Sequence, residues 1–332
     1  MSIEQNQPAA DTSLGPLVTI VIPCWNAERF IADAIHSALA QTYKNKEIVV
    51  IDDGSTDRSL AVIQSFGRAV RWETGPNRGG SAARNRGVVL ARGDLIQFLD
   101  ADDLLASEKL QRQVPLLLED NRLVVYCDAV DLDLVSGAVR TRSPREHDHF
   151  RVCCFDRIGT PGPIHWKAAL VEIGGFDETL PCAQEFDLHL RLACRGFRFQ
   201  RLPRALVTYR RTASGVSTDY VRVLKCMGSI VQKVGTLMKL ADENYSERRR
   251  ALSEVLAHAA VQLLDRGHDA WCKQYLLLAR DLHPSGGMQI FAPQRRIIYK
   301  SLGVERSHPM LHKLTRLWRT CNGSSTRRTQ SR

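Results

Sequence analysis

The sequence predicts an α/β fold whose mixed, mainly parallel sheet is flanked by helices and followed by a helical C-terminal extension. Short β-branched runs alternate with helical patterns in the N-terminal part of the chain, which is the sequence form of a parallel sheet. The loops after these runs are rich in Gly, Asp, Asn and Pro. From about residue 220 the short runs give way to long helical patterns.

Each predicted strand is a short apolar segment that ends in a polar loop, and the strands are expected over 17–22, 47–52, 70–73, 95–100 and 123–127. Helical spacing of apolar residues predicts the intervening helices over 27–41, 57–66, 81–91 and 107–119. Beyond residue 220, helices are expected over 221–240, 246–266 and 270–281. The short break between the last two favours a helical hairpin.

Composition narrows the class of protein. The chain has 332 residues, of which 44% are hydrophobic, and this is enough for one large or two ordinary domains. Its apolar runs are shorter than a membrane-spanning helix. Residues 1–15 carry no Lys, no Arg and no apolar block, so we expect a flexible tail, no secretory signal and a cytoplasmic location. The nine cysteines are scattered, which predicts reduced and mostly buried thiols.

The net charge of +10 is concentrated in the C-terminal third. Residues 1–218 hold 26 Lys and Arg against 27 Asp and Glu, whereas residues 219–332 hold 20 against 9. Within residues 290–332, an apolar stripe that includes Trp318 is flanked by basic side chains, which suits an anionic membrane surface at the inner face. A helix packed on the protein is an equal alternative. Nucleic acid is disfavoured as a partner, because the excess charge avoids the α/β part and lacks interleaved aromatic residues.

Three polar loops should converge on one crevice, because ligands of open α/β sheets bind beyond the carboxyl ends of the strands. These loops span 23–26, 52–57 and 100–103. Taken alone, the second loop is better explained as a capped turn before a helix than as a ligand site. The third places Asp100, Asp102 and Asp103 within four residues, and crowded carboxylates repel one another unless a cation is present. Hard oxygen ligands of this kind suit Mg²⁺ or Mn²⁺ that carries a diphosphate.

Four ordered sequence blocks, together with two later ones, resemble the family 2 inverting glycosyltransferases of GT-A fold. They are Ile20-Val21-Ile22-Pro23-Cys24-Trp25-Asn26, Val49-Val50-Ile51-Asp52-Asp53-Gly54-Ser55-Thr56-Asp57, Asn77-Arg78-Gly79-Gly80-Ser81-Ala82-Ala83-Arg84-Asn85-Arg86-Gly87, Phe98-Leu99-Asp100-Ala101-Asp102-Asp103, Gly174-Gly175-Phe176-Asp177-Glu178 and Gln184-Glu185-Phe186-Asp187-Leu188-His189-Leu190-Arg191. The resemblance covers about 16–218. It implies a GT-A catalytic domain there, preceded by the 1–15 tail and followed by a helical extension over 219–289 and the basic tail over 290–332.

The resemblance also implies roles for individual residues. The nucleoside and diphosphate pocket would be formed by Pro23, Asn26, Glu28, Asp52, Arg84 and Asp100. Asp100 and Asp102 would be the D-x-D pair that holds Mg²⁺ or Mn²⁺. Glu185 would be the base that takes the acceptor proton, in a place where many relatives carry Asp. Its alternative is a surface carboxylate on an amphipathic helix that buries Phe186, Leu190 and Ala193.

The implied function is transfer of a sugar from a nucleoside diphosphate to a hydroxyl group of a carbohydrate or lipid-linked acceptor, in cell-surface polysaccharide or lipopolysaccharide assembly. A sugar nucleotidyltransferase would use a similar acidic metal site but release pyrophosphate. A noncatalytic nucleotide-sugar-binding module would bind the donor without turnover. Near Tyr209 relatives often carry a His that is absent here, so we expect Arg210 or Arg211 to contact the diphosphate. His165 and Trp166 are expected either in the acceptor cleft or in the core.

Overall fold

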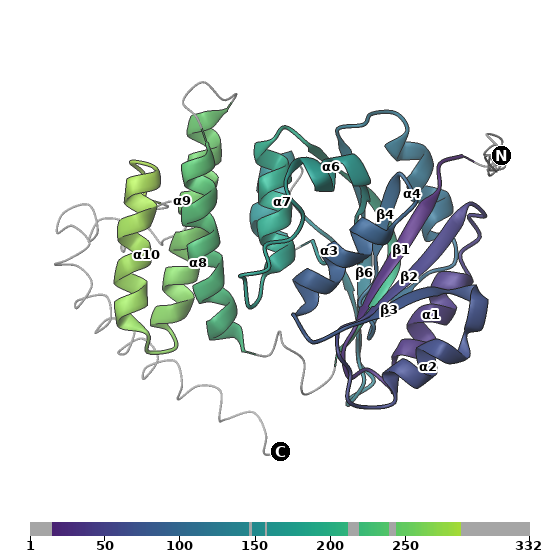
Figure 1. The fold of residues 1–332 in the computed structure, drawn as a ribbon. Helices are drawn as coiled ribbons and strands as arrows, with labels where there is room; N and C mark the ends of the chain where they lie inside the picture. The colour runs from purple at the N-terminus through teal and green to yellow at the C-terminus, as the bar shows by residue number, and fades with distance from the viewer. Residues whose placement is uncertain (1–14, 146–147, 157, 212–218, 239–243, 287–332) are drawn as a thin grey trace, which may run out of the picture. The chain divides into compact units, whose positions relative to one another are not determined.

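The computed structural model describes residues 15–145, 148–156, 158–211, 219–238 and 244–286 (Figure 1). The chain forms two compact units. The first comprises residues 1–145, 157–180 and 191–215, and the second comprises 146–156, 181–190 and 216–332. The second unit therefore includes two segments that lie within the 16–218 range of the expected catalytic domain.

The first unit is built on a nine-stranded mixed sheet in the order β3-β2-β1-β4-β8-β6-β9-β5, with β7 paired to β6. The first four strands in this order are parallel, β6 and β9 are also parallel, and most paired residues lie in parallel pairs. Strand β8 is antiparallel to both β4 and β6. The strands are β1 (Val18–Cys24), β2 (Lys46–Asp52), β3 (Arg71–Thr74), β4 (Leu95–Phe98), β5 (Leu104–Leu105), β6 (Leu123–Asp133), β7 (Val139–Arg142), β8 (Ile164–Trp166) and β9 (Arg198–Arg211).

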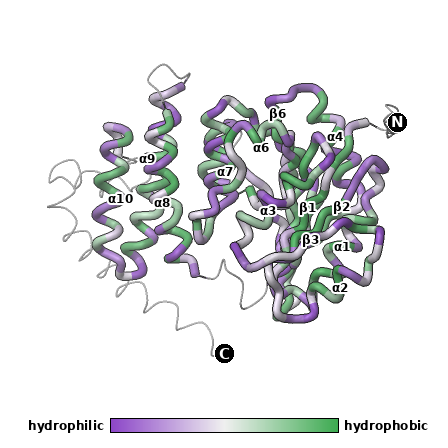
Figure 2. The backbone as a smooth tube through the Cα atoms, viewed as in Figure 1, coloured by the Kyte–Doolittle hydropathy of each residue, from purple (hydrophilic) through white to green (hydrophobic). Residues whose placement is uncertain are grey.

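Helices cover both faces of this sheet. They are α1 (Ile31–Leu39), α2 (Ser59–Ser65), the short 3₁₀ helix η2 (Gly67–Ala69), α3 (Gly80–Leu90), α4 (Lys109–Leu117) and α6 (Lys167–Glu172). Side chains of β1 alternate between the faces, so Ile20 and Ile22 join one buried cluster with α1, α2 and α4. A second cluster joins β2 to α3 on the other face. The central strands appear as hydrophobic segments in Figure 2, as expected for strands buried on both faces.

Helix α3 lies unusually close to β1 at Gly87. A methyl group on Gly87 would lie only 2.2 Å from Val21 Cγ1. Only glycine allows this approach without displacing the strand or the helix. Helix α3 also carries Arg84, one of the predicted pocket residues.

We expect Gly87→Ala to lower the free energy of unfolding by about 1–3 kcal/mol, because overpacking outweighs the better helix propensity of alanine. Urea unfolding followed by circular dichroism measures this change. The double variant Gly87→Ala/Val21→Ala removes the clashing methyl group and should lose less stability than the two single changes added together. A strictly additive double variant would contradict the close contact.

The second unit is helical. It contains α5 (His149–Phe155), the start of α7 (Gln184–Cys194), α8 (Tyr220–Leu237), α9 (Tyr245–Leu264) and α10 (Asp269–Leu282). Asp148 caps α5, since its Oδ1 accepts hydrogen bonds from Phe150 N at 3.0 Å and Arg151 N at 2.8 Å. Tyr275 of α10 is 1% exposed and donates a hydrogen bond to the Lys225 carbonyl of α8 at 2.8 Å.

The predicted strands and the helices of both parts are confirmed, with shifted ends. The helix expected over 27–41 is shorter, since α1 begins at Ile31. Strands β5, β7, β8 and β9 and helices α5 and α6 were not predicted. No helix within the described ranges combines the length and apolar character that a membrane span requires. The expected basic helix within 290–332 lies outside the described residues.

Candidate active site

A cavity of about 390 Å³ opens beyond the carboxyl ends of the parallel strands in the first unit. The predicted loops after β1, β2 and β4 each contribute to its wall, together with the loop before α3. The lining residues are Pro23, Cys24, Trp25, Asp53, Asn77, Gly79, Gly80, Ala83, Arg84, Asp100 and Ala101. The expected convergence of these loops is confirmed.

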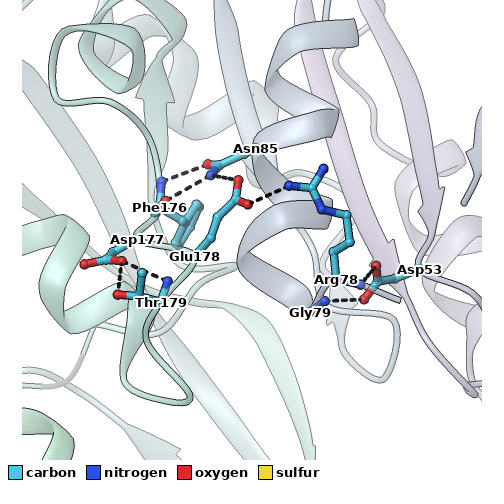
Figure 3. Close-up of polar contacts among 8 residues, drawn as sticks. All are labelled: Asp53, Arg78, Gly79, Asn85, Phe176, Asp177, Glu178 and Thr179. Atoms are coloured by element: carbon cyan, nitrogen blue, oxygen red, sulfur yellow. Dashed lines mark hydrogen bonds and ion pairs between the residues drawn. The ribbon is translucent and has the colours of Figure 1, made fainter. Parts of the chain in front are cut away.

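The N-terminus of α3 forms one wall of the cavity. Its N-cap is Gly79, which has a φ of 91°, and the helix starts at Gly80. Asp53 fixes the preceding turn, because its carboxylate accepts hydrogen bonds from Arg78 N and Gly79 N, both at 2.8 Å (Figure 3). The first turn of a helix leaves backbone N–H groups free and carries partial positive charge, so this wall suits an anionic ligand such as a phosphate.

Arg84 places a positively charged guanidinium group in the same wall of the cavity. Its guanidinium pairs with Asp100 Oδ1 at 2.6 Å, and it lies 5.3 Å from the centre of the Phe176 ring. Phe176 is 3% exposed and packs edge-on against Phe98. The arginine is therefore held between a carboxylate and an aromatic ring, and its side chain has little freedom to leave the cavity.

The loop after β4, residues 100–103, carries three aspartates that are crowded together and largely buried; we call it the acidic loop. The pKa of Asp102 is raised, first by burial and then by the nearby Asp100 carboxylate. The pKa of Asp103 is raised well above its usual range by burial and by both other aspartates. Arg210 supports this loop, because its backbone N–H donates to Asp103 Oδ1 at 3.1 Å and its guanidinium donates to the Asp102 carbonyl.

Arg210 is anchored as well. Its Nη1 donates to Asp33 Oδ2 at 2.7 Å and its Nη2 to the Phe30 carbonyl at 3.2 Å. We expected Arg210 or Arg211 to contact a diphosphate. In the structure the Arg210 guanidinium braces the acidic loop, and Arg211 pairs with Asp131 at 2.8 Å.

The acidic loop fits a hard divalent cation that shares its coordination with substrate. Its donors are carboxylate oxygens whose mutual repulsion a cation would relieve. Within the described residues, no three His, Cys, Asp or Glu side chains converge as a ready metal site. A cation here would therefore take one or two carboxylates from the protein and complete its shell with substrate oxygens and water, as Mg²⁺ commonly does.

Three predicted pocket residues lie in the cavity wall and three lie beside it. Pro23, Arg84 and Asp100 line the cavity. Asn26, Glu28 and Asp52 are engaged with the protein instead. Asn26 Oδ1 accepts from Thr56 N at 2.8 Å, Glu28 Oε2 accepts from Arg58 N at 2.9 Å, and Asp52 Oδ2 accepts from Thr74 Oγ1 at 2.6 Å. The first two contacts join the loop after β1 to the loop after β2, and the third joins the end of β2 to the end of β3.

Glu185 occupies the first turn of α7, in the second unit, and is half-buried. The buried helix face expected from the sequence is present, because Phe186, Leu190 and Ala193 are 6%, 0% and 2% exposed.

His165 and Trp166 belong to the core: His165 is 1% exposed and packs against Phe98, and Trp166 packs on the main buried cluster.

Several residues of the cavity wall were not predicted as site residues, and Trp25 and Asp53 are the most informative of them. Trp25 is 58% exposed and offers a flat apolar surface to a ligand ring. Its signal was an aromatic residue in an otherwise polar loop directly after a strand. Asp53 directly follows the predicted Asp52. Successive side chains of a strand point to opposite faces, and this alternation is the only sequence signal for which of the two carboxylates faces the cavity.

Asn85 links α3 to the turn that contains Phe176 and Glu178 (Figure 3). Its Oδ1 accepts from Phe176 N at 2.8 Å, and its Nδ2 donates to Phe176 O and Glu178 Oε1, both at 2.9 Å. Glu178 also pairs with Arg78 at 3.4 Å. The same turn accepts hydrogen bonds from Arg191 of α7 at the Ile173 and Gly175 carbonyls. The turn therefore supports Arg84 through the Phe176 ring.

We expect Asn85→Leu to lower the free energy of unfolding by about 2–3 kcal/mol, since three hydrogen bonds worth about 1 kcal/mol each are lost and a buried N–H and carbonyl are left without this partner. Asp177→Asn is a matched control in the same turn, because the Asp177 carboxylate accepts hydrogen bonds from Thr179 N and Thr179 Oγ1 within that turn. Equal losses in the two variants, measured by urea unfolding, would show that Asn85 is not the anchor.

Comparison with known proteins identifies the family of this chain. The sequence profile described as "Glycosyl transferase family 2" matches residues 19–160. The chain is 32% identical over 209 residues to the amylovoran biosynthesis glycosyltransferase AmsB of Erwinia amylovora, which covers 58% of this chain and 68% of AmsB. Other curated glycosyltransferases match at 37% and 32% identity, and the chain spans only 52% and 57% of their length.

Two solved structures share the fold. The TarS fragment of S. aureus in complex with UDP-GlcNAc has a TM-score of 0.69 at 18% identity, covering 88% of this chain and 89% of that one. The mannosyltransferase PcManGT of Pyrobaculum calidifontis, in complex with GDP-Man and Mn²⁺, has a TM-score of 0.59 at 17% identity, covering 91% and 87%. The fold is thus of the GT-A type. The chain belongs to glycosyl transferase family 2.

Proposed function

We propose that this glycosyltransferase is inverting and metal-dependent, and that it moves a sugar from a nucleoside diphosphate to a hydroxyl group of a carbohydrate or lipid-linked acceptor. The observation that carries the proposal is the cavity in which the α3 N-terminus and Arg84 meet the carboxylate of Asp100. Positive groups suit the diphosphate, and the adjoining carboxylates suit a cation shared with it.

The proposed donor pocket is formed by residues of the first unit. The N–H groups at the start of α3 and the Arg84 guanidinium would hold the diphosphate, and Trp25 would pack on a ring of the nucleotide sugar. Asn26, Glu28 and Asp52 would shape the nucleoside side of the pocket by bracing its loops. The relatives support a UDP- or GDP-linked sugar, because TarS was solved with UDP-GlcNAc and PcManGT with GDP-Man.

Asp102 and Asp100 would hold Mg²⁺ or Mn²⁺. A cation held there would offset the negative charge that develops on the diphosphate as the glycosidic bond breaks. Arg210 would keep the acidic loop in position through the Asp102 carbonyl. The Mn²⁺ in the PcManGT complex supports the choice of metal.

Glu185 would act as the general base. It would accept the proton of the acceptor hydroxyl as that oxygen attacks the anomeric carbon on the face opposite to the leaving diphosphate, which inverts the configuration. The name of AmsB supports a role in cell-surface polysaccharide assembly.

A donor screen tests the proposal. The full-length protein is incubated with UDP- and GDP-sugars, Mn²⁺ or Mg²⁺, and a mixture of lipid-linked and free glycan acceptors. We expect nucleoside diphosphate release that requires both metal and acceptor. Release of pyrophosphate would indicate a sugar nucleotidyltransferase, and tight donor binding without product would indicate a binding module.

A further inference from the structure

Two buried cysteines of the second unit lie almost within bonding distance. Cys182 Sγ and Cys226 Sγ are 2.8 Å apart, and the two residues are 5% and 9% exposed. This separation is shorter than a van der Waals contact between sulfur atoms, whereas a disulfide bond measures about 2.05 Å. Cys182 lies in the turn before α7, and Cys226 lies in α8.

The turn that holds Cys182 is tightly defined. Ala183, the next residue, has a φ of 57°, which is a left-handed conformation that costs energy for alanine. Its carbonyl accepts a hydrogen bond from Asp187 N at 3.2 Å in the first turn of α7. Asp187 in turn is fully buried and pairs with Lys233 of α8 at 2.9 Å. This segment is therefore already fixed to α8 on one side.

The surroundings of Cys182 favour the protonated form of its thiol. Burial, the hydrogen bond with Cys226 and the charge of Glu185 raise the pKa of Cys182 to about 12, against a smaller opposing effect of Arg222. Cys182 is therefore a thiol at neutral pH, and its thiolate forms rarely. The influence of Glu185 also means that the thiol lies within electrostatic range of the carboxylate proposed as the base.

We propose that Cys182 and Cys226 form an oxidisable pair that closes a disulfide bond when the chain meets a peroxide, and that this bond tethers the turn before α7 to α8. One thiolate attacks the peroxide, the O–O bond breaks, and a sulfenic acid and water form. The second thiol attacks the sulfenic sulfur, its S–O bond breaks and a second water leaves. The pair loses two electrons and two protons, and hydrogen peroxide is reduced to two waters.

Closing the bond requires only a small movement, because the sulfur atoms start 2.8 Å apart and end about 2.05 Å apart. The crosslink restricts the unfolded chain over the segment between the two residues, so it should raise the unfolding temperature. It also fixes the turn three residues before Glu185. The expected effect on turnover rests on the proposed function, whereas formation of the disulfide bond does not depend on it.

Peptide mapping tests the bond directly. Trypsin cleavage after Lys and Arg releases Cys182 in residues 168–191 and Cys226 in residues 226–233, each as the single cysteine of its peptide. The native full-length protein is treated with hydrogen peroxide, free thiols are alkylated under denaturing conditions, and the digest is analysed without reduction. We expect the two peptides linked, lighter than their sum by two hydrogen atoms, and separated again by dithiothreitol. Recovery of both as alkylated or singly oxidised peptides would overturn the proposal.

Two variants separate this bond from general oxidation. Cys226→Ala should abolish the linked peptide and the peroxide-induced rise in the unfolding temperature, whereas Cys194→Ala, which removes a more exposed thiol, should leave both unchanged. Turnover is then compared for reduced and oxidised protein. We expect at least a twofold, dithiothreitol-reversible change in kcat that Cys226→Ala lacks. A linked peptide in a protein with no transferase activity would contradict the proposed function but leave the modification site intact.

Discussion

Replacing Glu185 by glutamine is expected to abolish sugar transfer while leaving donor binding nearly intact. A positioned general base contributes about 10²–10⁴-fold to a rate, so kcat should fall by that factor. Glutamine keeps the size of the side chain but cannot take the acceptor proton. The affinity for the nucleotide sugar should change little, because Glu185 is not among the residues that line the cavity. Calorimetric binding and product formation measure the two effects separately.

Glu185→Asp is the matched control. Aspartate restores the carboxylate but is shorter by one methylene group, so part of the transfer activity should return. Neither change is expected to disturb the helix, because α7 is held by buried apolar residues such as Leu188 and Leu190. Transfer at the wild-type rate by Glu185→Gln would exclude this residue as the base.

The sequence predicts the strands and helices whose positions are determined by local residue patterns. Strands β1 to β4 and helices α1 to α4 were predicted, because periodic apolar residues and polar loops mark them. Strand β9 was not. It pairs with β6 although the two lie more than sixty residues apart in the chain, and its register shifts near Asp128. Such pairing is set by tertiary contacts, which leave little local signal.

The site was predicted to the level of loops but not of every side chain. Pro23, Arg84 and Asp100 lie in the wall of the cavity, whereas the predicted Asp52 lies beside it and its neighbour Asp53, which was not predicted as a site residue, lies in the wall. The orientation of a carboxylate at a strand end depends on which N–H and hydroxyl groups surround it. These groups come from residues such as Thr74 and Gly79, which lie more than twenty residues away.

Lys109 is a buried charged residue that the hydrophobic pattern of the sequence does not predict. Lysine is rarely buried, yet Lys109 is 0% exposed, and burial lowers its pKa to about 8. Its ammonium group donates to the side-chain oxygens of Gln97 and Gln113. Gln113 in turn donates to the Val125 carbonyl at 2.9 Å. A buried charge is tolerated only with such partners, and sequence periodicity gives no sign of them.

The acidic loop should show opposite effects of one substitution on activity and on stability. We expect Asp102→Asn to lower metal-stimulated turnover by roughly a hundredfold or more, since it removes a ligand whose cation would stabilise the leaving diphosphate. The same change should raise the unfolding temperature of the metal-free protein. Burial and Asp100 raise the pKa of Asp102, so its ionised form destabilises the fold. This destabilisation is absent at acidic pH, where the carboxylate is protonated in both the folded and the unfolded protein. It is fully present at neutral pH, and there the asparagine variant removes it.

Asp94→Asn is the control for this variant, because Asp94 precedes β4 at the opposite end from the acidic loop and is exposed. It should match the wild type in both activity and stability. Differential scanning calorimetry without metal and a Mn²⁺ titration of turnover give the two readouts. If Asp102→Asn kept full Mn²⁺ stimulation, Asp102 would not be a metal ligand. If it instead lowered the unfolding temperature, the repulsion among the three aspartates would not be the dominant force on this loop.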